Sequence, residues 1–246
     1  MLRFNIQKSV FIASVRAALQ LLAVGLFFTA IFDHKFAELW SWLWVILMVL
    51  LATEIIRRRV PTVKRLSPVA LIAIITSVAI VVSVVFLFAV IDYTPINIVV
   101  VSGITIGNIV PSAVLAVQQL NMQLTSRRLE AESLLALGAD KSILTKFFAP
   151  QIIKTAITTQ IERTKVVGLI ALPGAMTGLL LAGVEPMDAV LLQLIVMYMI
   201  LGSATITVSM IVWFGLKLSL IHISEPTRRR GIDYYVLSLK KKIGGG

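Results

Sequence analysis

Six apolar runs separated by short charged segments restrict the fold of this chain more than any other feature. Each run has roughly twenty residues, enough for an α-helix that rises about 1.5 Å per residue to cross a hydrocarbon layer about 30 Å thick. The chain is 58% hydrophobic and 14% charged, with a mean hydropathy of +0.95, which soluble domains of 246 residues rarely reach. The pattern predicts an all-α, polytopic transmembrane helical bundle with about six spans, at residues 10–32, 39–56, 69–91, 96–120, from within 151–165 to 183, and 189–216.

The distribution of charge predicts how the spans are oriented. Nearly all cations fall on one side of the predicted membrane, and the strongest group is the basic loop Arg57–Arg65, which the positive-inside rule places in the cytoplasm. The three predicted outer loops carry one cation and five acids: Lys35, Asp33, Glu38, Asp92, Glu185 and Asp188. Six spans with both ends inside fit this distribution, so we expect a multi-pass protein of the cell (inner) membrane.

The net charge of +11 is explained by the orientation of the chain in a membrane and not by binding to nucleic acid. The basic residues flank apolar runs, as they do in membrane proteins. No aromatic residues alternate with them, whereas grooves that bind single-stranded nucleic acid combine cations with aromatic side chains. The chain has no cysteine, which excludes a disulfide framework and a thiolate metal site. Membrane lipid, and not nucleic acid, is therefore the expected partner of these residues.

The fifth run is apolar enough to lie in a bilayer, yet four glycines and Pro173 interrupt its stretch Lys165–Gly183. A backbone group opened by a proline costs several kcal/mol in hydrocarbon, so the break is expected to face protein or cavity water. Broken helices of this kind often form transport sites, and the alternative is a kinked helix with small residues at a helix crossing. The candidate residues of a translocation path in this stretch are Pro173, Gly174, Met176, Thr177 and Gly178.

The ligands of any metal ion on this path are left open by the sequence. Soft ions favour the sulfur of a methionine such as Met176, whereas hard ions favour oxygen ligands such as the hydroxyl of Thr177. Methionines in membrane helices, however, are mostly packing residues.

Other spans contain polar residues that are candidates for the same path. Arg16 and Gln20 lie four residues apart and share one face of the first span. A buried cation should face the bundle, although Arg16 is close enough to the headgroups to snorkel. Glu162 and Arg163, near the start of the fifth span, are expected to mark the cytoplasmic interface rather than a buried proton relay.

The fourth span combines small residues with a proline. Gly103 and Gly107 form a pair with the spacing that is typical of close helix packing. Asn108 follows directly and is a further candidate for the translocation path. Pro111 and Ser112 then predict a second interruption of a helix.

Residues 121–150 differ from the spans, because charged and apolar residues alternate there with a helical period. The segment is too polar to span, and Leu137, Gly138 and Ala139 break it. It could lie on the membrane surface or dock into a partner protein.

The tail from residue 218 loses the apolar periodicity and adds two basic triplets, Arg228–Arg230 and Lys240–Lys242. The stretch Ser219–Arg229 looks like the conceptual translation of a sequencing adapter, so we assign the permease domain to residues 1–217 and expect residues 218–246 to be non-native or disordered. The alternative is a basic cytoplasmic tail in which His222 is a surface residue.

Several of these motifs occur in order and at fitting spacing, and together they resemble the FetB-type permease family over about residues 3–216. They are Val15–Leu21, Gly103–Asn108, Leu137–Ala139 and Lys165–Gly183. The resemblance implies a membrane subunit of an ABC transporter linked to iron export in bacteria, with plant relatives linked to aluminium tolerance.

The chain departs from the family pattern in two places. Ala175 precedes Met176 where the family usually has a methionine pair. Family members also usually begin with one further apolar helix, which would make this reading frame incomplete.

The segment Glu132–Ala139 is similar to the cytoplasmic coupling segment of ABC importer permeases. The resemblance implies that two helices joined by a glycine turn seat in a groove of an ATPase. The candidate coupling residues are Glu130, Glu132, Leu137, Gly138 and Ala139. A cytoplasmic ABC ATPase subunit and a second copy of the permease are the partners that follow, and no cofactor is expected in this chain.

Two other classes of function are weaker. A secondary transporter would need a charged site within the spans, for which only Arg16 and Glu162 are available. An intramembrane enzyme would need a nucleophile elbow or an HExxH motif, and both are missing. The chain also has no phosphate-binding loop, so ATP hydrolysis is expected on a separate chain.

Overall fold

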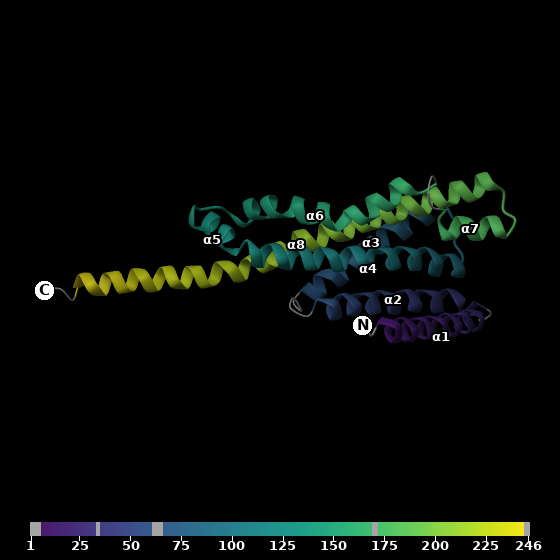
Figure 1. Ribbon diagram of the computed structural model, residues 1–246, viewed down its shortest axis with the longest axis horizontal. Helices are drawn as coiled ribbons and strands as arrows, with labels where there is room; N and C mark the ends of the chain where they lie inside the picture. The colour runs from purple at the N-terminus through teal and green to yellow at the C-terminus, as the bar shows by residue number, and fades with distance from the viewer. Residues whose placement is uncertain (1–5, 33–34, 61–65, 169–171, 244–246) are drawn as a thin grey trace, which may run out of the picture.

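The computed structural model describes residues 6–32, 35–60, 66–168 and 172–243. Within them the chain folds into eight α-helices, which confirms the predicted all-helical membrane bundle (Figure 1). They are α1 (Ile6–Phe32), α2 (Ala37–Arg59), α3 (Ser67–Leu87), α4 (Pro95–Ser126), α5 (Arg128–Ala136), α6 (Lys141–Val166), α7 (Gly174–Leu181) and α8 (Pro186–Ile243). The predicted loop residues Asp33 and His34 and the basic turn at 61–65 lie outside the described residues.

Five of the described helices are long and apolar enough to cross a membrane: α1, α2, α3, α4 and the first part of α8, Pro186–Leu218. The predicted fifth span differs from this pattern. It is divided into α6, which carries six charged residues, and α7, which has only 8 residues. The helix cannot continue through the break, because Gly168 adopts a left-handed φ of +85° and Pro173 has no backbone donor.

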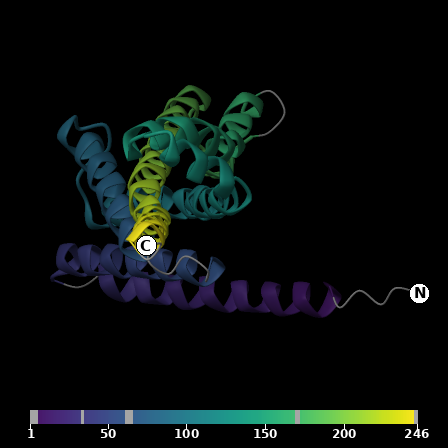
Figure 2. The same cartoon turned by 90° about the vertical axis from the view of Figure 1, so that its left-hand side faces the viewer.

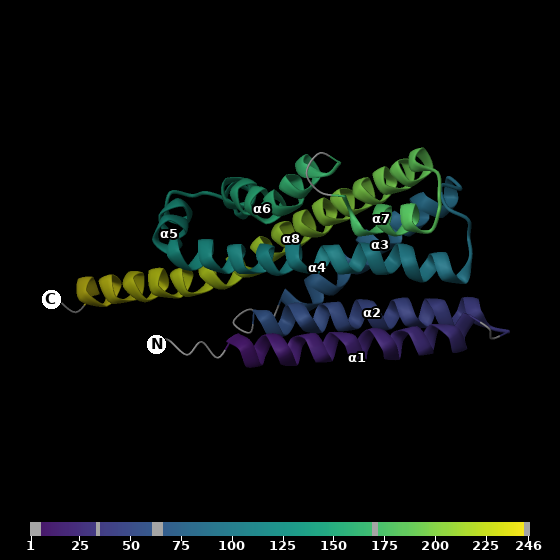
Figure 3. The same ribbon diagram turned by 45° about the vertical axis from the view of Figure 1, so that its right-hand side comes forward.

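The core lies between α2, α3, α4, α6 and α8, and α4 is at its centre. Figures 1 and 3 show α1 and α2 on one side of α4 and α6 and α7 on the other, and the end-on view in Figure 2 agrees. Residues of α4 such as Ile98, Ile109 and Ala113 are completely buried. The helix interruption predicted at Pro111 does not occur, because α4 continues through this proline to Ser126.

Hydrogen bonds in the core and at a helix start hold α3, α4 and α8 in position. The hydroxyls of Ser77 on α3 and Thr207 on α8 are 2.6 Å apart in the core. At the start of α4, the Thr94 hydroxyl accepts a hydrogen bond from the backbone N–H of Asn97 at 3.2 Å, as an N-cap residue does. The helix can start there because Pro95 occupies a first-turn position whose N–H has no partner within the helix.

The outer end of the bundle is joined by a chain of polar side chains. The Tyr93 hydroxyl donates to a carboxylate oxygen of Glu38 at 2.5 Å and accepts from the indole N–H of Trp42 at 3.3 Å. The hydrogen bond to Glu38 raises the pKa of Tyr93 above its ordinary value. The loop between α3 and α4 is thereby attached to the start of α2.

Candidate functional site

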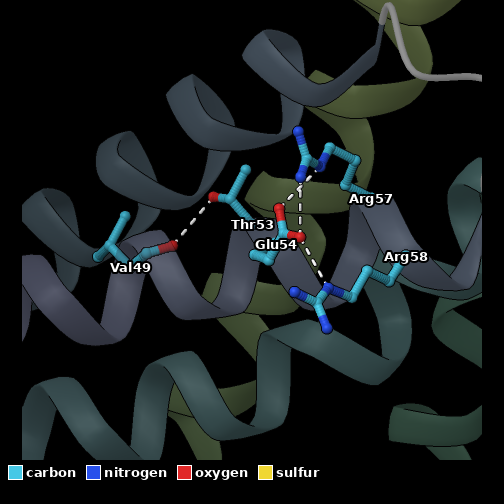
Figure 4. A network of polar contacts seen from close by, with 5 residues as sticks. All are labelled: Val49, Thr53, Glu54, Arg57 and Arg58. Carbon is cyan, nitrogen blue, oxygen red and sulfur yellow. Dashed lines mark hydrogen bonds and ion pairs between the residues drawn. The ribbon is translucent and has the colours of Figure 1, made fainter.

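The basic end of α2 marks one end of the bundle. The Glu54 carboxylate accepts from both Arg57 and Arg58, each at 2.7 Å, while the Thr53 hydroxyl donates to the Val49 carbonyl (Figure 4). Exposed ion pairs of this kind contribute roughly 0–1 kcal/mol to stability. Because the single carboxylate of Glu54 is shared by two arginines, the end of α2 remains a basic surface. Figure 3 shows α5 at the same end of the molecule, which agrees with the predicted clustering of cations on one side.

The predicted glycine turn is present between α5 and α6. Gly138 has a φ of +88°, and the backbone N–H groups of Gly138 and Ala139 donate to the carbonyls of Leu135 and Leu134 at 3.0 and 2.9 Å. These bonds close the end of α5 in a Schellman-type cap, in which a left-handed residue favours glycine. The chain therefore reverses at this glycine, as the sequence predicts.

Arg127 attaches α5 to the bundle. Its guanidinium donates to both carboxylate oxygens of Glu130, at 2.6 and 2.7 Å. The same group lies 5.1 Å from the ring centroids of Phe147 and Phe148 on α6, and the second of these rings is buried. Ala131 on α5 is also completely buried. The helix α5 thus packs against α4 and α8, and Arg127, directly before it, contacts α6.

The outer face of α5 has no neighbour among the residues that the structure describes. Leu129 and Leu137 are 80% and 85% exposed, and Glu132 lies beside them in an ion pair with Arg128 at 2.8 Å. The predicted coupling residues Glu130, Glu132, Leu137, Gly138 and Ala139 therefore occupy one protrusion, with the leucines at its surface. Exposed leucines rimmed by charges are typical of a protein–protein contact.

A polar seam joins α4 and α6 where Pro111 has removed a backbone donor. The Gln160 side chain is buried and donates to the Asn108 carbonyl at 3.1 Å and to the Ser112 hydroxyl at 3.4 Å. The Asn108 side chain in turn donates to the Ile104 carbonyl at 2.8 Å. The side-chain bonds reach the Asn108 and Ile104 carbonyls, on either side of the Gly107 carbonyl whose helical partner Pro111 lacks.

A small polar cavity of about 40 Å³ lies against this seam. Thr159, Gln160 and Arg163 of α6 line it opposite Ser112 of α4. Its volume and its polar groups suit a water molecule.

The same seam sets the depth of Glu162 and Arg163. Asn108 and Ser112 lie near the middle of α4, and Gly103, five and nine residues before them, packs against Met48 near the middle of α2. The expectation that Glu162 and Arg163 mark the cytoplasmic interface stays a prediction, and these residues follow Gln160, which bonds to the middle of α4.

The interrupted stretch forms a separate cavity. Ala175 and Gly178 of α7 face α4 and α8 across a space of about 320 Å³ with almost entirely apolar walls. Pro173 precedes α7 in an extended conformation, and its carbonyl accepts from the Thr177 hydroxyl at 3.1 Å. Residues 169–171, which belong to the predicted stretch, lie outside the described residues.

The glycines of this stretch are not required for close packing within the chain. A Cβ atom added at Gly174 or Gly178 would meet no other atom within 4 Å, whereas one at Gly103 would lie 3.2 Å from Met48. Of the predicted GxxxG pair, Gly107 likewise has no close neighbour. Helix packing inside one chain thus accounts for Gly103 alone among these four glycines.

The predicted path residues are not brought together in one chain. Arg16 and Gln20 line a shallow groove on α1, which packs on α2 at the opposite side of the bundle from α7 (Figure 1). Asn108 belongs to the seam between α4 and α6, while Pro173, Gly174, Met176, Thr177 and Gly178 lie in or beside α7. No group of three or more His, Cys, Asp or Glu side chains within the described part of the chain could hold a metal ion.

Sequence reasoning missed Gln160, although the sequence contains its signal. Every fourth residue of α6 before it is buried: Leu144, Phe148, Ile152 and Ala156. Gln160 continues this series, and a buried glutamine must find a hydrogen-bond partner.

Comparison with known proteins places the chain in a family. The profile of the Uncharacterised protein family (UPF0014) matches residues 1–219, which leaves the tail after Ser219 outside the match. The "UPF0014 membrane protein STAR2" of Oryza sativa subsp. japonica is 32% identical over 205 residues, covering 83% of this chain and 72% of that protein. The "Protein ALUMINUM SENSITIVE 3" of Arabidopsis thaliana is 30% identical over 192 residues, covering 78% and 70% of the two chains.

A bacterial relative has a name that states a transport role. The "Probable iron export permease protein FetB" of Escherichia coli (strain K12) is 27% identical over 205 residues, covering 83% of this chain and 79% of that protein. No solved structure is significantly similar to the chain. The fold, the apolar spans and the extent of these matches together show that the chain is a multi-pass membrane protein of the UPF0014 family, to which FetB-type permeases belong.

Proposed function

We propose that this chain is the membrane permease subunit of an ATP-driven ABC transporter that exports metal ions such as iron. ATP is hydrolysed on a separate cytoplasmic ATPase, and two copies of the permease form the complete unit. The protrusion formed by α5 and the Gly138 turn carries the proposal, because it exposes apolar side chains at the basic, cytoplasmic end of the bundle. The name of the Escherichia coli relative supports the substrate and the direction of transport.

The protrusion is short and firmly attached to the bundle, as a segment that inserts into a groove of the ATPase would need to be. The helix is short, its end is fixed by a left-handed glycine, and its inner face is attached through Arg127 and Ala131. A force applied to Leu137 would therefore be transmitted to α4 and α6. Those two helices meet again at Gln160, and we propose that movement of the protrusion reaches the middle of the bundle through this contact.

The translocation path is proposed to include the face of α7 that carries Met176 and Thr177, as soft and oxygen contacts for the substrate; the apolar cavity on the other face of α7 is lined instead by Ala175 and Gly178. Arg16 and Gln20 on α1, and Asn108 on α4, could join this path only in an assembly that brings separate faces together, such as the proposed homodimer. A substitution tests the first part directly. Met176→Leu should change metal resistance of cells at normal expression, and unchanged resistance removes Met176 from the path.

The decisive experiment tests the coupling residues with a matched control. Gly138→Val introduces backbone strain of roughly 1–3 kcal/mol at the turn, and Gly183→Val introduces the same strain at the outer end, where φ is +83° and the added atoms also meet no neighbour. We expect Gly138→Val and Glu132→Lys each to weaken co-purification of the ATPase at least tenfold, while Gly183→Val leaves it unchanged.

Substrate-dependent ATP hydrolysis by the reconstituted pair is the second measurement. It should fall together with binding in Gly138→Val and Glu132→Lys. Wild-type binding and hydrolysis in both variants would mean that α5 is only a surface helix, and the ATP-driven proposal would lose its support.

A secondary transporter is the second candidate, because a carboxylate, Glu162, follows Gln160, which bonds to the middle of α4. Transport in proteoliposomes without nucleotide, driven by a proton gradient and abolished by Glu162→Gln, would favour it. Strict dependence on ATP and the partner chain would exclude it.

A further inference from the structure

An apolar groove of about 290 Å³ lies between α2 and α3 on the surface of the bundle. Ile46 of α2 and Ile75 of α3 line it, and each is about half exposed. The helix α1 packs elsewhere, because the ring of its Phe27 lies 4.8 Å from that of Trp44, and two residues of a helix separate Trp44 from Ile46 by more than half a turn. Among the described residues the groove is therefore uncovered, and lipid or another protein must fill it.

The groove has the length of an acyl chain in one leaflet. Along α3 it extends from Leu71 to Val82, or about 16 Å at the rise of a helix. The hydrocarbon layer is about 30 Å thick, so one leaflet supplies about half of that depth. Leu71 lies one turn after Ser67, where α3 starts at the basic end of the bundle. The groove therefore begins close to the membrane surface that the positive-inside rule places in the cytoplasm.

Arg57 lies above this end of the groove, on the groove's side of α2. It follows Ile46 by eleven residues and Leu50 by seven, which are close to three and two full turns, so the three side chains share one face. Helical side chains also lean toward the N-terminus, which here is toward the groove. Figure 4 shows Arg57 and Arg58 on different sides of Glu54, so only the first of these two arginines is aligned with the groove.

Arg57 can bind an anion without leaving Glu54 unpaired. Its Nε and Nη2 atoms donate to the Glu54 carboxylate at 2.7 and 2.9 Å, whereas a guanidinium has five N–H donors. The same carboxylate also accepts from Arg58 at 2.7 Å, so it keeps a partner if Arg57 turns away. With Arg59, the last turn of α2 has three arginines against this single acid, and the excess charge is positive.

We propose that this groove binds an anionic phospholipid of the cytoplasmic leaflet, with one acyl chain between α2 and α3 and the headgroup phosphate on Arg57. Arginine suits this role because its planar fork can bind two phosphate oxygens at once. Basic side chains beside a span also attract anionic lipids more strongly than zwitterionic ones. A helix of another protein could fill the groove, but it would not require a cation at this end. The proposal is independent of the transport role and of the ATPase.

Native mass spectrometry of the full chain, released from detergent micelles, measures the dissociation constants of two lipids that differ only in headgroup. They are palmitoyl-oleoyl phosphatidylglycerol and the phosphatidylcholine with the same chains. We expect the anionic lipid to bind about fivefold or more tightly than the zwitterionic one. Glycerophosphoglycerol, the same headgroup without chains, should not compete at equal concentration, because it cannot occupy the groove.

Two pairs of variants test the two halves of the site. Arg57→Gln should weaken binding of the anionic lipid about fivefold. Arg59→Gln is its control, because it removes the same charge two residues later on the opposite side of α2, and its effect should stay below about twofold. Ala79→Phe places a ring in the groove and should weaken both lipids about fivefold or more, since the ring takes the space of the chain. Ala18→Phe, at an exposed alanine of α1, should change neither lipid.

Three outcomes would overturn the proposal. Equal affinities for the two lipids, or equal losses in Arg57→Gln and Arg59→Gln, would show only a general attraction of the basic end. Competition by the free headgroup would place the ligand on the arginine alone. A dimer that Ala79→Phe dissociates, with lipid affinity unchanged, would assign the groove to a contact between copies of the chain. Ala79→Leu is measured as well, so that a folding defect caused by the ring does not affect the test.

Discussion

Two glycines of α8 illustrate how much the surroundings of a single residue matter. A Cβ atom added at Gly215 would lie 2.8 Å from Cδ1 of Leu120 on α4 and 3.3 Å from Cδ2 of Leu66. An atom added at Gly202, on the same helix, would meet nothing within 4 Å. Gly215 therefore allows the close contact between α8 and α4, whereas among the described residues no contact depends on Gly202.

The first prediction compares these two glycines. Gly215→Ala should lower the free energy of unfolding by about 1–3 kcal/mol, because the leucine side chains must leave their positions. Gly202→Ala should be neutral or stabilise by up to about 1 kcal/mol, since alanine favours a helix interior. Thermal unfolding in detergent micelles, followed by tryptophan fluorescence, measures both, and equal midpoints would contradict the packing at Gly215.

The second prediction concerns the seam between α4 and α6. Gln160→Leu removes the side-chain donor to the Asn108 carbonyl and the Ser112 hydroxyl, at a cost of about 0.5–2 kcal/mol in the bundle. Gln151→Leu is the matched control, because Gln151 is exposed on the same helix. The unfolding midpoint should fall for the first variant only. A loss of similar size in both would mean that the seam does not stabilise the bundle.

At the scale of elements, the attachment of α5 depends on the shape of one guanidinium. Arg127 forms two parallel hydrogen bonds with Glu130 and lies over two aromatic rings of α6, whereas Arg128 makes a more exposed pair with Glu132. Lysine keeps the charge but can neither form the two parallel bonds nor stack as a plane. The two arginines should therefore respond differently to the same substitution.

The third prediction follows from this difference. Arg127→Lys should loosen α5 by about 0.5–1 kcal/mol, a value limited by the partial exposure of the pair. Arg128→Lys should have almost no effect. Amide hydrogen exchange over residues 128–140 measures the change as faster exchange in the first variant. Unchanged exchange would show that Ala131 and the Gly138 turn hold the helix without the arginine.

At the scale of the whole molecule, orientation follows from which ends of the helices lie together. The basic end of α2, the helix α5 and the start of α6 share one end of the bundle, and the start of α2 and the loop between α3 and α4 lie at the other (Figure 3). The hydrogen bonds between Glu38, Tyr93 and Trp42 join these two segments. The cations at the first end should face the cytoplasm.

The fourth prediction tests this orientation with single cysteines at Arg59, Ser142 and Glu185. In intact cells an impermeant thiol reagent should label position 185 only, and in opened cells it should label all three. Labelling of position 59 in intact cells would overturn the topology. The cysteine-free parent chain provides the blank.

The sequence by itself determined the membrane class, the four apolar spans before residue 121 and the start of the last one, because length and hydropathy decide whether a helix can cross a bilayer. It also determined the turn at Gly138, since a left-handed cap is a local requirement of the backbone. Tertiary structure decided the rest. Pro111 leaves α4 unbroken. Gln160, which is distant in sequence, bonds to the middle of α4. The predicted fifth span divides into α6 and α7. The depth of Glu162 and Arg163 follows from the packing of α6 against α4, which no local pattern contains.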